Sequence, residues 1–323
     1  MRPISSWRQA VARTDQVPHG THPPASATPG RGAGALACAL AFLLLALFLP
    51  DLRLPRDIYE YVVVFDITQS MDVADAEIDG VPVSRLQLAR ESARLALREL
   101  PCGSRIGWGA FTEYRTLLLL TPVEVCANYH GLVASLEAID GRMRWSNASE
   151  IGKGVYWAAR AALDTQPTPD VIFISDGHEA PPLRPGAPPF IPEDLQRGQV
   201  RGWIVGTGSS VPQPIPKSDD QGRRVGYWRA GEVVQYATMD AEGRRIRSNE
   251  HLSALHENHL QAIANRVGFE YIRLDEPALL VNAMLDRRFA RRRPAEVDLS
   301  WLPLAVAIAL LVWAFRPSLR GDP

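Results

Sequence analysis

The sequence predicts a doubly wound α/β domain with a mostly parallel sheet and one antiparallel edge strand, flanked by two transmembrane helices. Three observations lead to this prediction. Short, almost continuous apolar runs are typical of strands that are covered on both faces. Segments with a helical repeat of apolar residues separate these runs. An uncharged apolar stretch also lies near each end of the chain.

The run YEYVVVFD at residues 59–66 is expected to form the first buried strand. A helix is expected to follow from Ser84, because the apolar positions beyond it repeat with a period near 3.6. Ser84 and Gln87 match a capping box, and Val83 and Leu88 match the accompanying hydrophobic staple. The sequence therefore indicates a strand, a loop and a well-defined helix start.

A hairpin follows this helix, with strands at 105–111 and 116–120 on either side of the turn TEYR. Cys102 and Cys126 are equally distant from Tyr114 in that turn, so antiparallel pairing would bring them face to face. A disulfide there would require an oxidising compartment. The alternative is a pair of buried free thiols.

The remaining elements continue the alternation of strands and helices. We expect helices near 129–138, 151–164, 251–267 and 277–290, and strands at 170–175, 202–206 and 269–274. The domain is thus predicted at 58–290. The segment 207–250 is polar and glycine-rich. It is longer than the usual connection between a strand and a helix, so we interpret it as an inserted loop or hairpin.

The uncharged stretches at 32–50 and 299–315 are predicted to span a membrane, because eighteen helical residues rise about 27 Å. Arginines in the N-terminal tail (1–31) favour a bacterial inner membrane protein with the domain in the periplasm and both termini, including the tail at 316–323, in the cytoplasm. The arginine run at 287–293 weighs against this orientation. It is otherwise interpreted as a solvated helix end.

Nucleic acid and nucleotides are not expected ligands. The net charge is -1, so no global field attracts a polyanion. The chain also lacks the glycine-rich motifs that cradle phosphates.

Oxygen-bearing side chains follow two of the predicted strands. Asp66, Thr68 and Ser70 end the first strand, and Asp176 follows the strand at 170–175. Ser149 lies where the segment SNASEIGKG enters a helix. Carboxyl ends of parallel strands meet at one sheet edge, and oxygen ligands suit Mg²⁺, with Mn²⁺ or Ca²⁺ as alternatives. The sequence therefore predicts a metal site there.

These segments resemble the metal-ion-dependent adhesion site of von Willebrand factor A domains, whose pattern is Asp-x-Ser-x-Ser, a distant Thr and a distant Asp in (Thr/Ser)-Asp-Gly. This chain has Thr68 and Ser149 where the family usually has Ser and Thr. The resemblance covers 58–290 apart from the insertion at 207–250. It implies that the hydroxyls bind the metal directly, that the aspartates act mainly through water, and that an acidic side chain of a protein partner completes the site. A vestigial, metal-free site is the alternative.

The segments DITQSM, PVSRL, LPCGSRIGWGAFTE and SDGHEAPP are similar to accessory proteins of methanol dehydrogenase gene clusters, which work beside MoxR-type AAA+ ATPases. This resemblance implies a non-enzymatic factor that binds an immature periplasmic quinoprotein, or another accessory subunit, during calcium loading. A membrane scaffold without a metal role stays open as an alternative.

A metal-dependent hydrolase is a further alternative, with His178 or Glu179 as general base, although a solvated loop pair is the simpler interpretation of these residues. His256 and His259 lack the His-Glu-x-x-His pattern and are interpreted as part of a polar helix face.

Two basic residues precede the hydroxyl of the third segment. Arg142 and Arg144, in GRMRWSN, stand shortly before Ser149. We expect these two arginines to contact an acidic surface of a protein partner.

Overall fold

The computed structural model describes residues 31–50, 52–183, 187–219, 221–233, 238–239, 242, 245–246 and 249–315. The chain divides into two compact units, Asp51–Val297 and the pair of segments Met1–Pro50 and Asp298–Pro323. Apart from Arg31, the expected tails at 1–31 and 316–323 lie outside the described residues.

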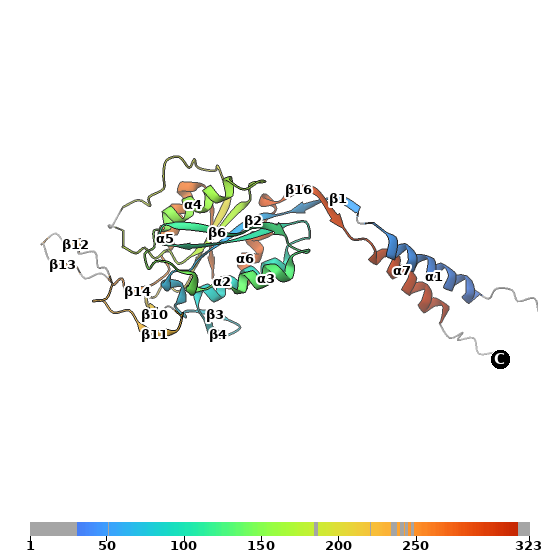
Figure 1. Cartoon of the computed structure of the whole chain (residues 1–323), viewed down its shortest axis with the longest axis horizontal. Coiled ribbons are helices and arrows are strands. Elements are labelled where there is room, and N and C mark those ends of the chain that lie inside the picture. Colours follow the sequence, from blue (N-terminus) through green and yellow to red (C-terminus); the bar gives the residue numbers. More distant parts are fainter. Residues whose placement is uncertain are drawn as a thin grey trace, which may run out of the picture. The chain divides into compact units, whose positions relative to one another are not determined.

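A six-stranded sheet forms the centre of the larger unit (Figure 1). In spatial order its strands are β15 (Glu270–Leu274), β8 (Gly202–Thr207), β7 (Asp170–Ser175), β2 (Glu60–Asp66), β5 (Arg105–Thr112) and β6 (Arg115–Glu124). All neighbours pair in parallel except β5 and β6, which pair antiparallel at the edge. The predicted doubly wound sheet with one antiparallel edge strand is confirmed.

Strand β2 shows why two helical layers form. Successive side chains of a strand point to opposite faces. Tyr61, Val63 and Phe65 contribute to one hydrophobic core, whereas Val62 and Val64 contribute to the other. The first core is completed by α2 (Arg85–Glu99), α3 (Tyr129–Glu137) and α6 (Pro277–Met284), and the second by α4 (Ile151–Leu163) and α5 (Glu257–Val267). The near-continuous apolar sequence of β2 is the consequence of burial on both faces.

Two expected helices are shorter than predicted. Helix α2 begins as expected, with Ser84 Oγ accepting a hydrogen bond from the Gln87 amide. Helix α5, however, begins at Glu257 rather than near 251, because Leu252–Ser253 form strand β14, which pairs with β9 (Gln213–Pro214). Helix α6 ends at Met284 rather than near 290.

The arginine run does not end a helix, and this prediction was wrong. After a short 3-10 turn, Arg291–Val297 form β16, which pairs antiparallel with β1 (Leu52–Ile58). Buried carboxylates explain why this segment is an extended strand. Arg291 forms ion pairs with Glu60 and with Asp170, the latter at 3.2 Å. The resulting ribbon extends the compact unit past the expected bounds of 58–290 on both sides.

The predicted pairing of the two cysteines is confirmed, although the register between β5 and β6 shifts on both sides of Trp108. Cys102 and Cys126 form a disulfide with their Cα atoms 5.3 Å apart. The insertion at 207–250 contains short two-residue to four-residue strands, among them β9 and the hairpin of β10 (Pro216–Ser218) and β11 (Arg224–Tyr227).

The smaller unit consists of α1 (Arg31–Phe48) and α7 (Trp301–Ala314), which contact each other. Ala35, Ala39 and Ala307 are buried between them. The structure differs from the predicted membrane spans at 32–50 and 299–315. Among the described residues, no helix is both long and apolar enough to cross a membrane. Helix α7 has 14 residues and rises only about 21 Å, and α1 stops two residues before Pro50.

Candidate metal centre

Two buried carboxylates meet at the carboxyl edge of the sheet. Asp66 is the last residue of β2, and Asp176 directly follows β7. The two strands are neighbours in the sheet, with Phe65 paired to Ile174. Both aspartate side chains are fully buried. The fold therefore brings together the two carboxylates that the sequence predicted, although 110 positions separate them.

Asp66 organises the turn that carries the first two hydroxyls. Its Oδ1 accepts hydrogen bonds from the Thr68 amide at 2.9 Å and from Thr68 Oγ1 at 2.7 Å. Its Oδ2 accepts one from Ser175 Oγ at 2.7 Å. Thr68 Oγ1 lies 3.1 Å from Ser70 Oγ. The alternating Asp-x-Thr-x-Ser sequence thus places both hydroxyls side by side at the start of a 3-10 turn, Gln69–Asp72, called η1.

Ser149 supplies the third hydroxyl from a different segment. Its backbone amide donates to the Ala180 carbonyl oxygen at 2.7 Å, and it accepts in return from the Ala180 amide at 2.8 Å. These bonds fix Ser149 just before α4. Its Oγ is buried and has no hydrogen-bond partner within the described part of the chain. A buried hydroxyl without a partner is costly, so this atom fits the role of a metal ligand.

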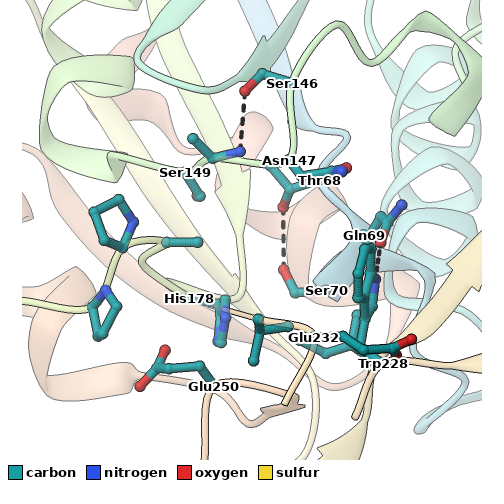
Figure 2. Close-up of a pocket in the computed structure, with 16 residues that line it drawn as sticks. Thr68, Gln69, Ser70, Ser146, Asn147, Ser149, His178, Trp228, Glu232 and Glu250 are labelled. Carbon is teal, nitrogen blue, oxygen red and sulfur yellow. Dashed lines mark hydrogen bonds between the residues drawn. The ribbon is translucent and has the colours of Figure 1, made fainter. Parts of the chain in front are cut away.

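The three hydroxyl residues face one cavity of about 450 Å³ (Figure 2). Thr68, Ser70 and Ser149 line it, whereas Asp66 and Asp176 are not among its lining residues. This arrangement fits an ion that is held by neutral oxygens, with the carboxylates behind them. Within the described residues, no group of three or more His, Cys, Asp or Glu side chains could hold a metal. The candidate centre contains only two carboxylates, so its donors are mostly hydroxyls.

Arg85 is a site residue that sequence analysis missed. It lies in the first turn of α2, and its side chain is 0% exposed. Nη1 lies 2.5 Å from Asp176 Oδ2, and Nη2 lies 2.6 Å from Asp75 Oδ2. Nη1 also donates to Ser253 Oγ at 2.7 Å. The available signal was an arginine among apolar residues in PVSRL, but only long-range contacts reveal its partners.

Because of the charge of Arg85, the pKa values of the two aspartates shift in opposite directions. Burial, followed by the negative charge of Asp176, raises the pKa of Asp66 above its ordinary value. Burial also acts to raise the pKa of Asp176, but the positive charge of Arg85 outweighs it and lowers that pKa. Asp176 is therefore the carboxylate that is held ionised.

His178 is buried and the Glu179 side chain is only 10% exposed, so the interpretation as a solvated loop pair was wrong. His178 is 7% exposed. The centroids of the His178 and His256 rings lie 5.9 Å apart. Glu179 Oε1 accepts a hydrogen bond from the Ile151 amide at 3.1 Å and lies 2.8 Å from His259 Nε2. Glu179 thus joins the first residue of α4 to α5, and His259 faces this contact.

The insertion forms one wall of the cavity, which the sequence did not predict. Trp228 Nε1 donates to Gln69 Oε1, which belongs to the residue between the two hydroxyls of the turn. Trp228, Glu232 and Glu250 line the cavity (Figure 2). Lys217 fixes Glu232 through an ion pair at 3.2 Å. Access to the hydroxyls is therefore shaped by the insertion.

The burial of Glu179 predicts a pH-dependent contribution to stability. Burial raises the pKa of its carboxyl group, although the hydrogen bond and charge of His259 partly oppose this. Because the folded-state pKa lies above the unfolded value, ionisation costs stability as pH rises through that interval. The free energy of unfolding of the native protein should therefore fall, relative to Glu179→Gln, between about pH 4.5 and pH 7. Urea unfolding at both pH values measures the difference. The exposed Glu99→Gln should show no such trend, and a constant difference for Glu179→Gln would contradict the prediction.

No protein-family model matches the chain. A UPF0353 protein of Mycobacterium tuberculosis (strain ATCC 25177 / H37Ra) is 25% identical over 264 residues, covering 76% of this chain and 73% of the relative. Among solved structures, the conserved hypothetical protein BatB from Bacteroides thetaiotaomicron has a TM-score of 0.48 with 19% identity, covering 71% of this chain and 97% of that one. An aerotolerance-related membrane protein from Bacteroides fragilis NCTC 9343 has a TM-score of 0.49 with 21% identity, covering 70% and 96%.

A von Willebrand factor type A structure from Catenulispora acidiphila is also similar, with a TM-score of 0.37 and 16% identity, covering 72% of this chain and 41% of that one. The similar proteins thus include UPF0353, BatB and von Willebrand factor A chains.

Proposed function

We propose that the larger unit is a von Willebrand factor A-type domain that binds a protein partner through a divalent metal ion. Thr68, Ser70 and Ser149 would hold Mg²⁺, or Mn²⁺ or Ca²⁺, with Asp66 and Asp176 supporting the ion from behind. The observation that carries the proposal is the convergence of three hydroxyls on one cavity, with the Ser149 Oγ buried and lacking a partner among the described residues.

The charges of this chain explain why the partner should present a carboxylate. The three hydroxyls are neutral, and Arg85 compensates Asp176. When bound, the ion would supply a positive charge that these residues do not fully neutralise. A carboxylate is the protein side chain that best satisfies such a hard cation. The proposal is for a binding protein rather than an enzyme. Of the two candidate general bases, Glu179 already bonds Ile151 and His259, whereas His178 lines the cavity.

We further infer that the domain works outside the cytoplasm, which the disulfide of Cys102 and Cys126 supports, because such bonds persist in oxidising compartments. The resemblance to methanol dehydrogenase accessory proteins supports a more specific role. The client would be an immature periplasmic quinoprotein or a fellow accessory subunit, served together with a MoxR-type ATPase during calcium loading. Normal quinoprotein activity in cells that lack this chain would contradict that role.

Metal-dependent capture tests the proposed function. The full chain should retain a protein from envelope extract in Mg²⁺, lose it in EDTA, and fail to retain it as Asp66→Ala. The exposed Asp57→Ala on β1 is the matched control and should behave like the native chain. Without a partner, Mg²⁺ at ten times its Kd should also stabilise the native chain by about 1.4 kcal/mol. Capture that is unchanged by EDTA and by Asp66→Ala, together with stability of the native chain that does not respond to Mg²⁺, would exclude a functional metal site.

A further inference from the structure

A second cavity of about 440 Å³ lies beside the candidate metal centre. The two cavities share two walls. In η1, Ser70 lines the first cavity and Asp72 lines the second. In the insertion, Ile215 lines the first cavity, and the next residue, Pro216, lines the second. A peptide that enters one cavity therefore has the other within reach of a few residues.

Arginine dominates the charge of this second cavity. Its charged lining residues are Arg90, Arg142, Arg144, Arg224, Asp72 and Asp140. Two of these arginines are neutralised by ion pairs. Arg142 pairs with Asp140 at 2.7 Å, and Arg144 pairs with Asp72 at 3.2 Å. The other two arginines form no ion pair with any described residue. Four arginines and two aspartates give the lining a net charge of about +2, although the charge of Arg90 also acts on the nearby Asp140 and Glu91.

Both of these arginines are held in place by uncharged groups. Arg90, on α2, donates through Nη1 to the carbonyl oxygens of Glu137 at 3.2 Å and Ile139 at 2.9 Å. Arg224, on β11, has its guanidinium 4.2 Å from the centre of the Tyr227 ring. A guanidinium that is already oriented loses less entropy on binding, and its planar fork matches a carboxylate.

We propose that the arginine cavity binds a second carboxylate of the same partner, so that the ligand is a short acidic peptide segment with two anchored acidic side chains. One carboxylate would enter the metal centre and the other would lie between Arg90 and Arg224. This inference rests on the proposed function and extends it, because it names the chemistry of the partner segment. It also gives the insertion a role, since Pro216, Ser218 and Arg224 form one side of the arginine cavity.

A fluorescein-labelled peptide of ten glutamates tests the inference by anisotropy on the full chain, in Mg²⁺ and in EDTA, with a ten-glutamine peptide as the blank. Arg224→Gln should weaken binding in Mg²⁺ about fivefold, the effect expected for one partly exposed ion pair. Arg224 is exposed on a short strand, so this variant should fold normally. Arg90→Gln should have a similar effect, and the exposed Arg266→Gln on α5 is the matched control that should have none.

The outcomes separate the inference from the function on which it rests. Metal-dependent binding that is unchanged in both arginine variants would overturn the arginine cavity and leave the metal centre standing. Arginine-dependent binding that ignores EDTA would support the acidic-peptide cavity and overturn the metal-dependent function. Binding of inorganic phosphate that depends on Arg224, without binding of the peptide, would overturn the peptide in favour of a small anion.

Discussion

Replacing Arg85 with methionine is expected to destabilise the larger unit by about 3–5 kcal/mol, the usual cost of removing one partner from a buried ion pair. The Arg85 side chain is 0% exposed and lies between Asp75 and Asp176. Methionine has a similar length but no charge, so both carboxylates would lose their counter-ion. Because Ser253 Oγ and its carbonyl oxygen also accept from Arg85, the base of the insertion would loosen as well.

The pH dependence identifies the cause of this loss. In the native protein the pKa of Asp176 lies below its ordinary value, mainly because Arg85 offsets the effect of burial, so its stabilising contribution is present above that ordinary value. Without Arg85, burial would raise the pKa of the Asp176 carboxyl group, and its ionisation would cost stability. The deficit of Arg85→Met should therefore shrink between about pH 7.5 and pH 5.

Urea unfolding at both pH values measures the deficit, and Arg98→Met is the matched control on the same helix. Arg98 is exposed, so its replacement should change the free energy of unfolding by less than about 0.5 kcal/mol. If Arg85→Met stayed within about 1 kcal/mol of the native protein, the buried network would not carry the stability assigned to it.

Removing the disulfide is expected to cost about 3.5 kcal/mol, because the bond closes a loop between residues 24 positions apart and so restricts the unfolded chain. The double variant Cys102→Ser with Cys126→Ser should show this loss in urea unfolding. Dithiothreitol should lower the native protein to the same stability without affecting the variant further.

Cys38 provides the control for the disulfide experiment. It is a free, exposed cysteine in α1, so Cys38→Ser should leave the unfolding of the larger unit unchanged. An unfolding midpoint that does not respond to reductant would mean that the bond does not form in the mature protein.

Local patterns determined much of the fold. The apolar run of β2, the cap at Ser84 and the hairpin around Tyr114 each depend on residues close together in the chain, and the structure contains all three. The metal-site prediction also had local sources, because Asp66, Thr68 and Ser70 share one turn. Asp176 followed from the rule that the carboxyl ends of parallel strands meet at one sheet edge.

Other features depended on contacts that no local pattern records. Arg85 reaches a carboxylate 91 positions away and a serine 168 positions away. The segment at Ser253 pairs with β9 and also accepts hydrogen bonds from that arginine, so the expected start of α5 was too early. Likewise, Arg291 pairs with Glu60 and Asp170, and β16 replaces the expected end of a helix.

The sequence by itself thus determined the strands of the central sheet, the helices that cover it and the disulfide pair, and it singled out the five oxygen-bearing residues of the candidate centre. Only the tertiary structure decided that Arg85 neutralises Asp176, that Glu179 caps α4, and that the insertion walls the cavity. The physical reason is that periodicity and capping reflect neighbours within a few residues. Buried charges, by contrast, are placed wherever the folded chain supplies an opposite charge or a hydrogen-bond partner.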